Sequence, residues 1–372
     1  MKTDSPILLS DAASTDKTKF RRALLKWFDA NQRDLPWRKK KTPYRIWVSE
    51  IMLQQTQVAT VIDYYKRFMK RFPTVRKLAA ADQSEVLKLW EGLGYYRRAR
   101  QLHAAAQAVV ESHGGKFPET FDEVLALPGI GRYTAGAILS ISLDQRLPIL
   151  EGNTIRLFAR LLAMRADPKT SANQKVLWDF SESIVPRNRA GDFNQALMEL
   201  GSQICTPKSP ACSECPIIRF CPTFAAGLQE SIPASSKKMK YEKIHEAVVL
   251  VAKQNQRQKC KRFLVRQCGP DERWTGLWDF PRFKFAAGDM GKQLRSELKS
   301  MSGLTVSIEP TEVQLRHAVT RFRITLDVFN GNDPQGRLQR RSDKTLRWAT
   351  AEQLEALPMS TTGRKIASRC CG

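Results

Sequence analysis

The sequence lacks any long apolar run. No stretch approaches the roughly 18 consecutive apolar residues of a membrane-spanning helix. The N-terminal stretch MKTDSPILLSDAASTDKTKF has only a short apolar patch and an early acidic residue, unlike a signal peptide. These absences predict an intracellular protein with no membrane partner, so its eight cysteines are not expected to form structural disulfides.

Acidic residues are also scarce. The chain has 37 Asp and Glu against 61 Lys and Arg, a formal net charge of +24. Residues 1–230 carry 34 basic and 23 acidic side chains, and residues 231–372 carry 27 and 14. A basic excess in both parts suggests that both hold a polyanion such as nucleic acid. A generally basic surface would give the same counts.

Strand patterns are missing from the first part of the chain. Four stretches there space their apolar residues as helices do: RRALLKWFDANQ, TQVATVIDYYKRFMKRF, ARQLHAAAQAVVESHG and TAGAILSISL. Later the pattern changes, and HEAVVLVAK, KRFLVRQ and TRFRITLDVF predict strands, with RSELKSM and AEQLEAL as helices. We therefore predict a disordered tail (1–19), an all-α domain (20–230), a linker (231–240) and an α+β domain (241–372).

The sequence does contain three patterns that indicate a particular chemistry. The first is CTPKSPACSECPIIRFC, in which four cysteines follow C-x6-C-x2-C-x5-C: Cys205, Cys212, Cys215 and Cys221. Zinc sites more often use two close cysteine pairs, and only one C-x-x-C occurs here. Four thiolates in the loop 205–221 fit an iron–sulfur cluster better. The remaining cysteines show no such pattern.

The second pattern is LALPGIGRYTAGAIL. Gly129 and Gly131 allow a tight turn between two helical stretches. The N–H groups at the start of the following helix would then be available to a phosphate, which the helix dipole favours. A simple connector between helices is an equally good interpretation of this turn by itself.

The third pattern is a pair of carboxylates in different settings. Glu50 lies in WVSEIMLQQTQV among apolar residues, where its proton should be held more tightly. Glu151 precedes a helix that begins near Asn153, whose positive end should keep it ionised. An acid beside an anion suits the cleavage of a bond to a sugar carbon. A surface Glu50 and a Glu151 that only caps its helix would be the structural alternative.

Together these segments resemble the adenine DNA glycosylases of the MutY type, in the helix–hairpin–helix, endonuclease III superfamily. The resemblance covers residues 20–225 through LPWR, SEIMLQQTQV, WEGLGYYRRARQLH, LPGIGRYTAG, LEGN and the cysteine loop. The second domain is similar to that family's Nudix-like domain through WTGLWDFP and LRHAVTRF. The implied fold is an all-α helix–hairpin–helix domain with an iron–sulfur loop, followed by an α+β Nudix-like domain.

The resemblance also implies a function and a set of site residues. It implies a monomeric enzyme, located with the DNA, that removes adenine mispaired with 8-oxoguanine or guanine in double-stranded DNA, and that carries one [4Fe–4S] cluster. Glu50 would be the general acid and Glu151 the second carboxylate, positioned with Tyr133 and Asn153. DNA and base contacts would come from Arg38, Gln54, Gln55, Tyr95, Gly129, Gly131, Gln195, Thr320 and Arg321.

The chain departs from the family pattern at several positions. Tyr133 stands where relatives that also cleave the strand have a Schiff-base lysine, so base removal without strand cleavage is expected. Glu151 replaces the usual aspartate, and Val319-Thr320-Arg321 replaces a usual Phe-Ser-His. A homologue with another target base, or one that binds DNA without catalysis, is the alternative.

The Nudix-like part lacks the acids of a Nudix hydrolase. In RSELKSMSGL, Glu297 is kept, but Lys299 and Ser300 stand where paired acids would bind magnesium. We therefore predict a recognition domain and no second hydrolase.

Overall fold

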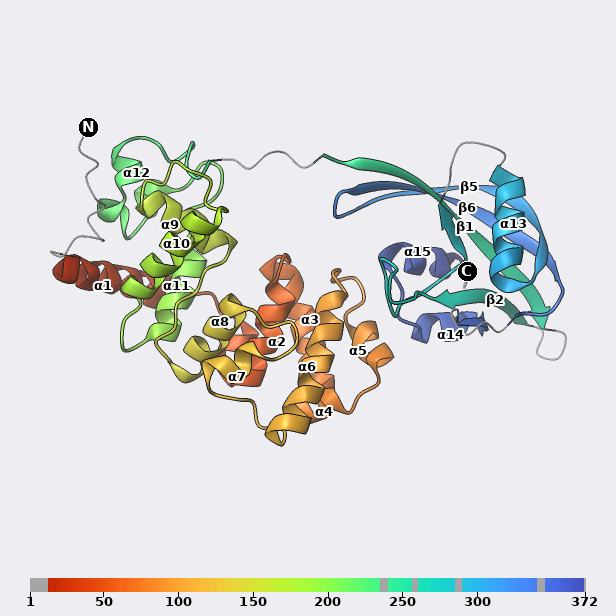
Figure 1. The fold of residues 1–372 in the computed structure, drawn as a ribbon, viewed down its shortest axis with the longest axis horizontal. Coiled ribbons are helices and arrows are strands. Elements are labelled where there is room, and N and C mark those ends of the chain that lie inside the picture. The colour runs from red at the N-terminus through yellow and green to blue at the C-terminus, as the bar shows by residue number, and fades with distance from the viewer. Residues whose placement is uncertain (1–12, 235–239, 256–259, 285–289, 340–344, 371–372) are drawn as a thin grey trace. The chain divides into compact units, whose positions relative to one another are not determined.

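The computed structural model describes residues 13–234, 240–255, 260–284, 290–339 and 345–370. Internal contacts divide the chain into two compact units, one of Met1–Ala80 and Gln101–Lys237, the other of Ala81–Arg100 and Lys238–Gly372. Figure 1 shows the helices and strands of the chain, coloured by residue number. No helix in the described ranges is long and apolar enough to span a membrane.

The first unit is built from helices, and its described residues contain no strand. Its elements are α1 (Ala13–Asn31), η2 (Pro36–Arg38), α2 (Pro43–Leu53), α3 (Val58–Arg71), α4 (Val75–Ala79), α6 (Arg97–His113, from Gln101 onwards), α7 (Phe121–Leu125), α8 (Arg132–Leu143), α9 (Gly152–Leu161), α10 (Ser171–Ile184), α11 (Ala190–Gln203), η3 (Cys212–Glu214), η4 (Ile218–Phe220) and α12 (Pro222–Ala225). The predicted all-α fold of this part is confirmed.

One core of this unit joins helices that are far apart in the sequence. Phe20 and Phe28 on α1 pack with Phe158 on α9, Phe180 on α10 and Phe193 on α11. Cysteines of the 205–221 segment pack against the same core. The core therefore connects the cysteine segment directly to α9, whose first residue follows Glu151.

The N-terminal boundary differs from the sequence prediction. Residues 1–12 of the predicted tail lie outside the described residues, but α1 already begins at Ala13. Two features favour a helix that begins before Phe20. Phe20 anchors it in the core, and Asp16 in the first turn interacts favourably with the positive end of the helix. Of the predicted linker, residues 235–239 also lie outside the described range.

The second unit has a mixed seven-stranded sheet between helices. Its elements are α5 (Gln83–Leu89), the first residues of α6, β1 (Glu242–Asn255), β2 (Cys260–Gln267), β3 (Trp278–Asp279), β4 (Arg282–Lys284), α13 (Met290–Ser302), β5 (Thr305–Val319), β6 (Phe322–Gln335), β7 (Leu346–Thr350), α14 (Ala351–Ala356) and α15 (Thr361–Cys370). The strand order is β3-β2-β1-β6-β5, with β4 paired to β1 and β7 to β2. The predicted α+β fold is confirmed.

Successive side chains of β1 point to opposite faces of the sheet and pack against different helices. Val248 packs with residues of α14 and α15, whereas Val249 packs with Leu294 and Leu298 of α13. β1 and β6 run parallel, and β5 returns antiparallel to β6 through the turn at Thr320 and Arg321. The sequence did not predict β5, because Pro310 and several charged residues interrupt its pattern. A register shift follows Pro310, and the strand lies at the end of the order, where a proline is tolerated.

Candidate active site

Glu50 is a buried carboxyl on α2. Thr42 caps this helix and Pro43 occupies its first turn, so the helix begins where the sequence favours it. Glu50 is only 5% exposed, which confirms the predicted burial. The Tyr133 hydroxyl, from the first turn of α8, donates a hydrogen bond of 2.6 Å to Glu50 Oε2.

Burial raises the pKa of Glu50 from 4.5 to about 7. The hydrogen bond from Tyr133 and the charge of Arg38 oppose this rise, and the charge of Glu151 adds to it. A raised pKa keeps Glu50 partly protonated at neutral pH, whereas an exposed Glu would be almost fully ionised. A carboxyl in this state can give a proton to a bound base.

Glu151 is the N-cap residue of α9. Its Oε2 accepts from the Asn153 N–H at 2.9 Å, and its Oε1 accepts from the Thr154 N–H at 3.0 Å. The Thr154 hydroxyl in turn accepts from the Glu151 N–H, which completes a capping box. The predicted position before the helix is thus confirmed, and the backbone N–H groups favour the anion.

The environment of Glu151 is less polar than the sequence suggested. Burial is the largest influence on the pKa of this carboxyl and raises it, while the hydrogen bonds from Asn153 and Thr154 and the charge of Arg156 lower it. From the sequence, only the effect of the helix end on this carboxyl was expected. Glu50 is buried and Glu151 is partly buried, but only Glu151 is bonded by two backbone donors, so Glu151 remains the better anion of the two.

A second polar cluster connects Arg38 with α11. Arg38 Nε donates to Gln195 Oε1 at 2.8 Å, and Arg38 Nη1 donates to Glu199 Oε1 at 2.6 Å. Arg33 forms a further ion pair with Glu199 at 3.1 Å. The structure therefore brings together Arg38 and Gln195, two residues predicted to line a base pocket.

Glu199 is a site residue that sequence reasoning missed. Its side chain is almost fully buried, and it holds two arginines and the Gln203 amide. A signal did exist, because Glu199 is an acid in the apolar stretch ALMELG, one helical turn after Gln195. Only the fold, however, places two arginines around it.

Asn153 and Arg156 connect the start of α9 with the cysteine segment. Arg156 Nη2 donates to Asn153 Oδ1 at 3.0 Å and to Gly201 O at 2.6 Å, while its Nε donates to Cys205 O at 2.7 Å. A Cβ on Gly201 would come within 2.8 Å of the Asn153 Cβ, so a larger residue there would push α11 away from α9. Arg156 was not predicted as a site residue.

Gln54 and Gln55 lie at the end of α2. Gln54 Nε2 contacts the Thr134 hydroxyl of α8 at 3.5 Å. Gln55 has a left-handed backbone with φ of 55°, which is uncommon for a residue other than glycine. This conformation ends α2 and turns the chain towards α3.

The predicted glycine hairpin joins α7 and α8. Gly129 has φ of 76°, and a Cβ there would meet the Gln101 side chain at 2.6 Å, so this position requires glycine. Gly131 is the N-cap residue of α8 and makes no side-chain cap. The first N–H groups of α8 therefore have no side-chain cap acceptor at Gly131, as a phosphate-binding helix end requires.

Three predicted DNA-contact residues belong to the second unit. Tyr95 is 51% exposed and has φ of 49°. Thr320 has φ of 51° at the turn between β5 and β6, next to the exposed Arg321. These residues are carried by Ala81–Arg100 and by the β-sheet, not by the helices that carry Glu50 and Glu151.

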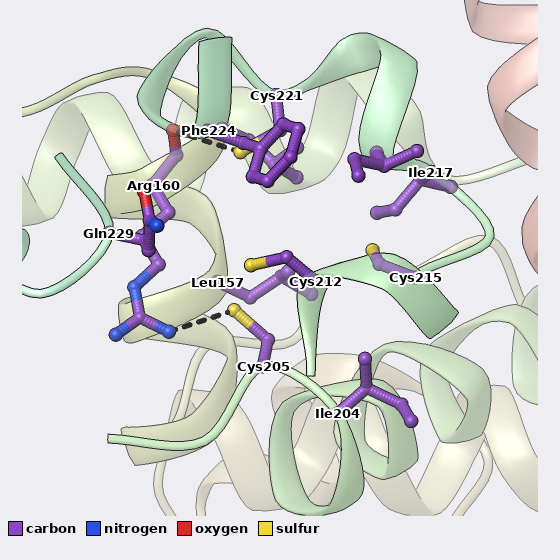
Figure 2. Close-up of a pocket in the computed structure, with 12 residues that line it drawn as sticks. Leu157, Arg160, Ile204, Cys205, Cys212, Cys215, Ile217, Cys221, Phe224 and Gln229 are labelled. Carbon is purple, nitrogen blue, oxygen red and sulfur yellow. Dashed lines mark hydrogen bonds between the residues drawn. The ribbon is translucent and has the colours of Figure 1, made fainter. Parts of the chain in front are cut away.

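The four cysteines line one pocket between α9, α11 and the loop that follows α11 (Figure 2). Apart from the thiols, the described lining is mainly apolar, and Arg160 contributes a charged side chain to it. Arg160 Nη1 donates to Cys205 Sγ at 3.2 Å and to Thr206 O at 2.8 Å. Four soft donors with a buried cation beside them fit an anionic cluster of iron and sulfur.

The donor spacing agrees with this assignment. In the described residues, no group of three or more His, Cys, Asp or Glu side chains is close enough to hold a single metal ion. In a [4Fe–4S] cluster each thiolate binds a different iron, so the cysteines need not converge on one point.

Comparison with known proteins defines the class of this fold and site. Residues 48–182 match the family described as HhH-GPD superfamily base excision DNA repair protein. Residues 205–221 match the iron–sulfur binding domain of endonuclease III, which indicates a [4Fe–4S] cluster in this segment. Residues 248–369 match the NUDIX domain.

Relatives then specify the family. An adenine DNA glycosylase of Rattus norvegicus is 51% identical over 223 residues, covering 58% of this chain and 43% of the relative. One from Buchnera aphidicola is 40% identical over 265 residues, covering 71% and 75%. The chain belongs to the adenine DNA glycosylase family. It spans less than half the length of the mammalian relatives that it matches.

A solved structure supports the fold of the helical unit. The structure of a thermostable thymine-DNA glycosylase aligns with a TM-score of 0.53 and 28% sequence identity. The alignment covers 58% of this chain and all of that protein.

Proposed function

We propose that this protein binds double-stranded DNA and hydrolyses the N-glycosidic bond of adenine mispaired with 8-oxoguanine or guanine, without cutting the strand. The observation that carries the proposal is the buried Glu50, whose pKa of about 7 and 2.6 Å bond from Tyr133 suit a general acid. Membership of the adenine DNA glycosylase family supports adenine as the base.

In the proposed reaction, Glu50 gives its proton to a ring nitrogen of the extruded adenine. The bond between the sugar carbon and the base then breaks, and its electron pair leaves with the base as a neutral molecule. Positive charge develops on the sugar, where the anionic Glu151 stabilises it. A water molecule completes the hydrolysis by adding hydroxide to the sugar carbon, and its proton restores Glu50.

Positioning residues surround the two carboxyls. Tyr133 holds Glu50 through the hydroxyl bond, and Asn153 holds Glu151 through its backbone N–H. We assign Arg38 and Gln195 to the adenine pocket and add Glu199, which orients Arg38. Because Tyr133 offers no amine, no imine with the sugar forms and the strand stays intact.

The DNA contacts of the proposal come from both units. Gln54 and Gln55 satisfy base edges near the extruded adenine, Tyr95 enters the base stack, and Gly129 and Gly131 seat a phosphate. Thr320 and Arg321 read the base opposite the adenine. We further propose that Cys205, Cys212, Cys215 and Cys221 each ligate one iron of the cluster, which braces the segment and takes no part in the hydrolysis.

The remaining assignments are proposed on the same basis. The protein acts as a monomer where the DNA is, inside the cell. Its functional domains are residues 20–230 and 241–372 with a linker between them, although internal contacts group Ala81–Arg100 with the second unit.

One experiment tests the proposed function. Purified protein is incubated with duplexes that contain A opposite 8-oxoguanine, A opposite G, T opposite G or only Watson–Crick pairs, with and without alkali afterwards. We expect adenine release from the first two duplexes and strand breaks only after alkali. Release of thymine in place of adenine would support a homologue with another target base. DNA binding without release would support the homologue without catalysis. Trapping of a covalent adduct by borohydride would contradict the assignment of Tyr133.

A further inference from the structure

The segment that carries Tyr95 forms a closely defined turn in the second unit. Gly92, Gly94 and Tyr95 all have a left-handed backbone, with φ of 95°, 76° and 49°. Arg98 donates to the Gly94 carbonyl at 3.2 Å, and its guanidinium lies 5.5 Å from the Trp90 ring and 5.4 Å from the Tyr95 ring. These contacts hold the turn in a conformation that leaves Tyr95 half exposed.

Residues on both sides of Tyr95 are bound to the C-terminal segment of the same unit. Glu91 accepts from Arg364 Nε at 2.5 Å and from Arg364 Nη2 at 3.1 Å, as a bidentate ion pair. The Tyr96 hydroxyl accepts from the Gly92 N–H at 3.2 Å and donates to the Met359 carbonyl at 3.1 Å. One hydroxyl thus connects the turn directly to the C-terminal segment.

The partners of the turn are themselves well anchored. Met359 is fully buried in the core between the sheet, α14 and α15, and the neighbouring Pro358 carbonyl accepts from the Trp278 N–H at 2.8 Å. Arg364 also donates to the Leu354 carbonyl at 2.8 Å. An ion pair whose partners are mostly buried and bonded elsewhere holds its geometry better than a surface pair.

We propose that Glu91 and Tyr96 are positioning residues for Tyr95, through which the Nudix-like domain sets how deeply this tyrosine enters the DNA. The inference rests on the proposed function, because it takes Tyr95 to enter the base stack. As a consequence, Tyr95, which would insert between base pairs of the duplex, belongs to the same unit as Thr320 and Arg321. Thr320 and Arg321 are the residues predicted to contact the base opposite the adenine. Recognition of the opposite base and opening of the duplex are then set by the same body of the protein.

A double-mutant cycle tests this positioning role. The variants Glu91→Gln and Tyr96→Phe are made in the wild-type and Tyr95→Ala backgrounds. The Kd is measured for a duplex with cleavage-resistant 2′-fluoro-adenosine opposite 8-oxoguanine, so binding is read whether or not the protein excises adenine. In the wild-type background we expect each variant to weaken binding by about tenfold, which is a usual size for the coupling between residues in contact. In the Tyr95→Ala background we expect no further loss.

The controls separate positioning from stability. Glu272→Gln removes another short Glu–Arg pair of the same unit, Glu272 with Arg266 at 2.6 Å, and should leave the Kd unchanged. Tyr96→Phe removes only a hydroxyl group and should therefore fold. It tests the proposal even if Glu91→Gln fails to fold. Losses that persist in full in the Tyr95→Ala background, or an unchanged Kd for a folded Tyr96→Phe, would overturn the proposal. If the wild type released no adenine, the proposed function would be overturned. The Kd values of the double-mutant cycle could still be measured and would still test the positioning role.

Discussion

At the scale of single residues, the candidate site depends on the free energy of burying a carboxyl. Glu50 accepts a short hydrogen bond from Tyr133 and lies on α2 among buried residues that are mostly apolar. Glu151 has two backbone donors at the end of α9. The same residue type thus holds its proton in one place and gives it up more readily in the other.

The first prediction concerns Glu50→Gln. The amide has nearly the size of the acid but no proton to donate, so we expect adenine excision to fall by at least about 100-fold, the usual scale of general acid catalysis. DNA binding should stay within a few-fold. Single-turnover excision and a binding titration are the measurements. Excision near the wild-type rate would mean that Glu50 is not the acid.

The second prediction is a pH dependence of stability at the same residue. The folded-state pKa of about 7 lies above the unfolded value of 4.5, so the native state binds the proton more tightly. This contribution to stability is fully present below pH 4.5 and is lost as the pH rises through about 7. The difference corresponds to about 3 kcal/mol. We therefore expect Glu50→Gln to be more stable than the wild type at pH 8, with much less difference at pH 5. Urea unfolding at both pH values checks this, and equal differences would contradict the raised pKa.

The third prediction concerns Glu151 and separates its two roles. Glu151→Gln keeps an oxygen that can cap α9, Glu151→Asp keeps the charge, and Glu151→Ala removes both. We expect the Gln and Ala variants to lose almost all excision and the Asp variant to keep it. Only the Ala variant should lose the cap, at about 1 kcal/mol of stability. If the Gln and Ala variants excise adenine like the wild type, Glu151 is a helix cap alone.

At the scale of elements, α9 connects the two chemical features of the helical unit. The helix begins after Glu151, and two turns later Arg160 is almost fully buried beside the cysteines. Arg160 donates to Cys205 Sγ, to Thr206 O and to Ile232 O at 2.8 Å. One rigid helix therefore relates the cysteine segment to the cap that holds Glu151.

The fourth prediction follows from these contacts. Arg160→Gln removes the cation beside the cysteines and leaves backbone carbonyls unpaired, so we expect lower iron content and a loss of about 3 kcal/mol or more of stability. Iron per chain, the visible absorbance of the cluster and the melting temperature are the measurements. Arg219→Gln, at an exposed arginine between Cys215 and Cys221, is the matched control. Full iron content in Arg160→Gln would show that the arginine does not support the cluster.

At the scale of the whole molecule, the residues proposed for chemistry and those proposed for recognition belong to different units. The helical unit carries both carboxyls and the cysteines, whereas the second unit carries Tyr95 and the turn at Thr320 and Arg321. Arg321 pairs with Glu242 only at 3.7 Å, and both side chains are largely exposed. Such a pair is weak, so Arg321 can leave it at little cost in free energy.

The fifth prediction tests recognition in the full-length chain. Thr320→Ala removes the hydroxyl at the tip of the turn, so we expect the preference for A opposite 8-oxoguanine over A opposite G to fall by about tenfold, the value of one good hydrogen bond. The ratio of the two single-turnover rates is the measurement. Ser307→Ala, at an exposed hydroxyl elsewhere on β5, should keep the ratio. An unchanged ratio in Thr320→Ala would require another reader of the opposite base.

Several parts of the site could be predicted because their signals are local. The cysteine spacing, the hairpin at Gly129 and the apolar setting of Glu50 are each visible within one short stretch. Glu199 and Arg156 could not be predicted in the same way, since their partners Arg38 and Cys205 lie 161 and 49 residues away. Strand β5 was missed because Pro310 and its neighbouring charges oppose the strand pattern that pairing with β6 imposes.

The sequence by itself determined the helical character of the first part and several strands of the second, because helix periodicity, caps and turns depend on residues only a few positions apart. It also determined the family, through short segments in a fixed order. Only the tertiary structure decided which charges meet. Burial against distant segments raises the pKa of Glu50, surrounds Glu199 with arginines and ties Glu91 to Arg364. Desolvation and ion pairing act through space, so they are settled only when the chain has folded.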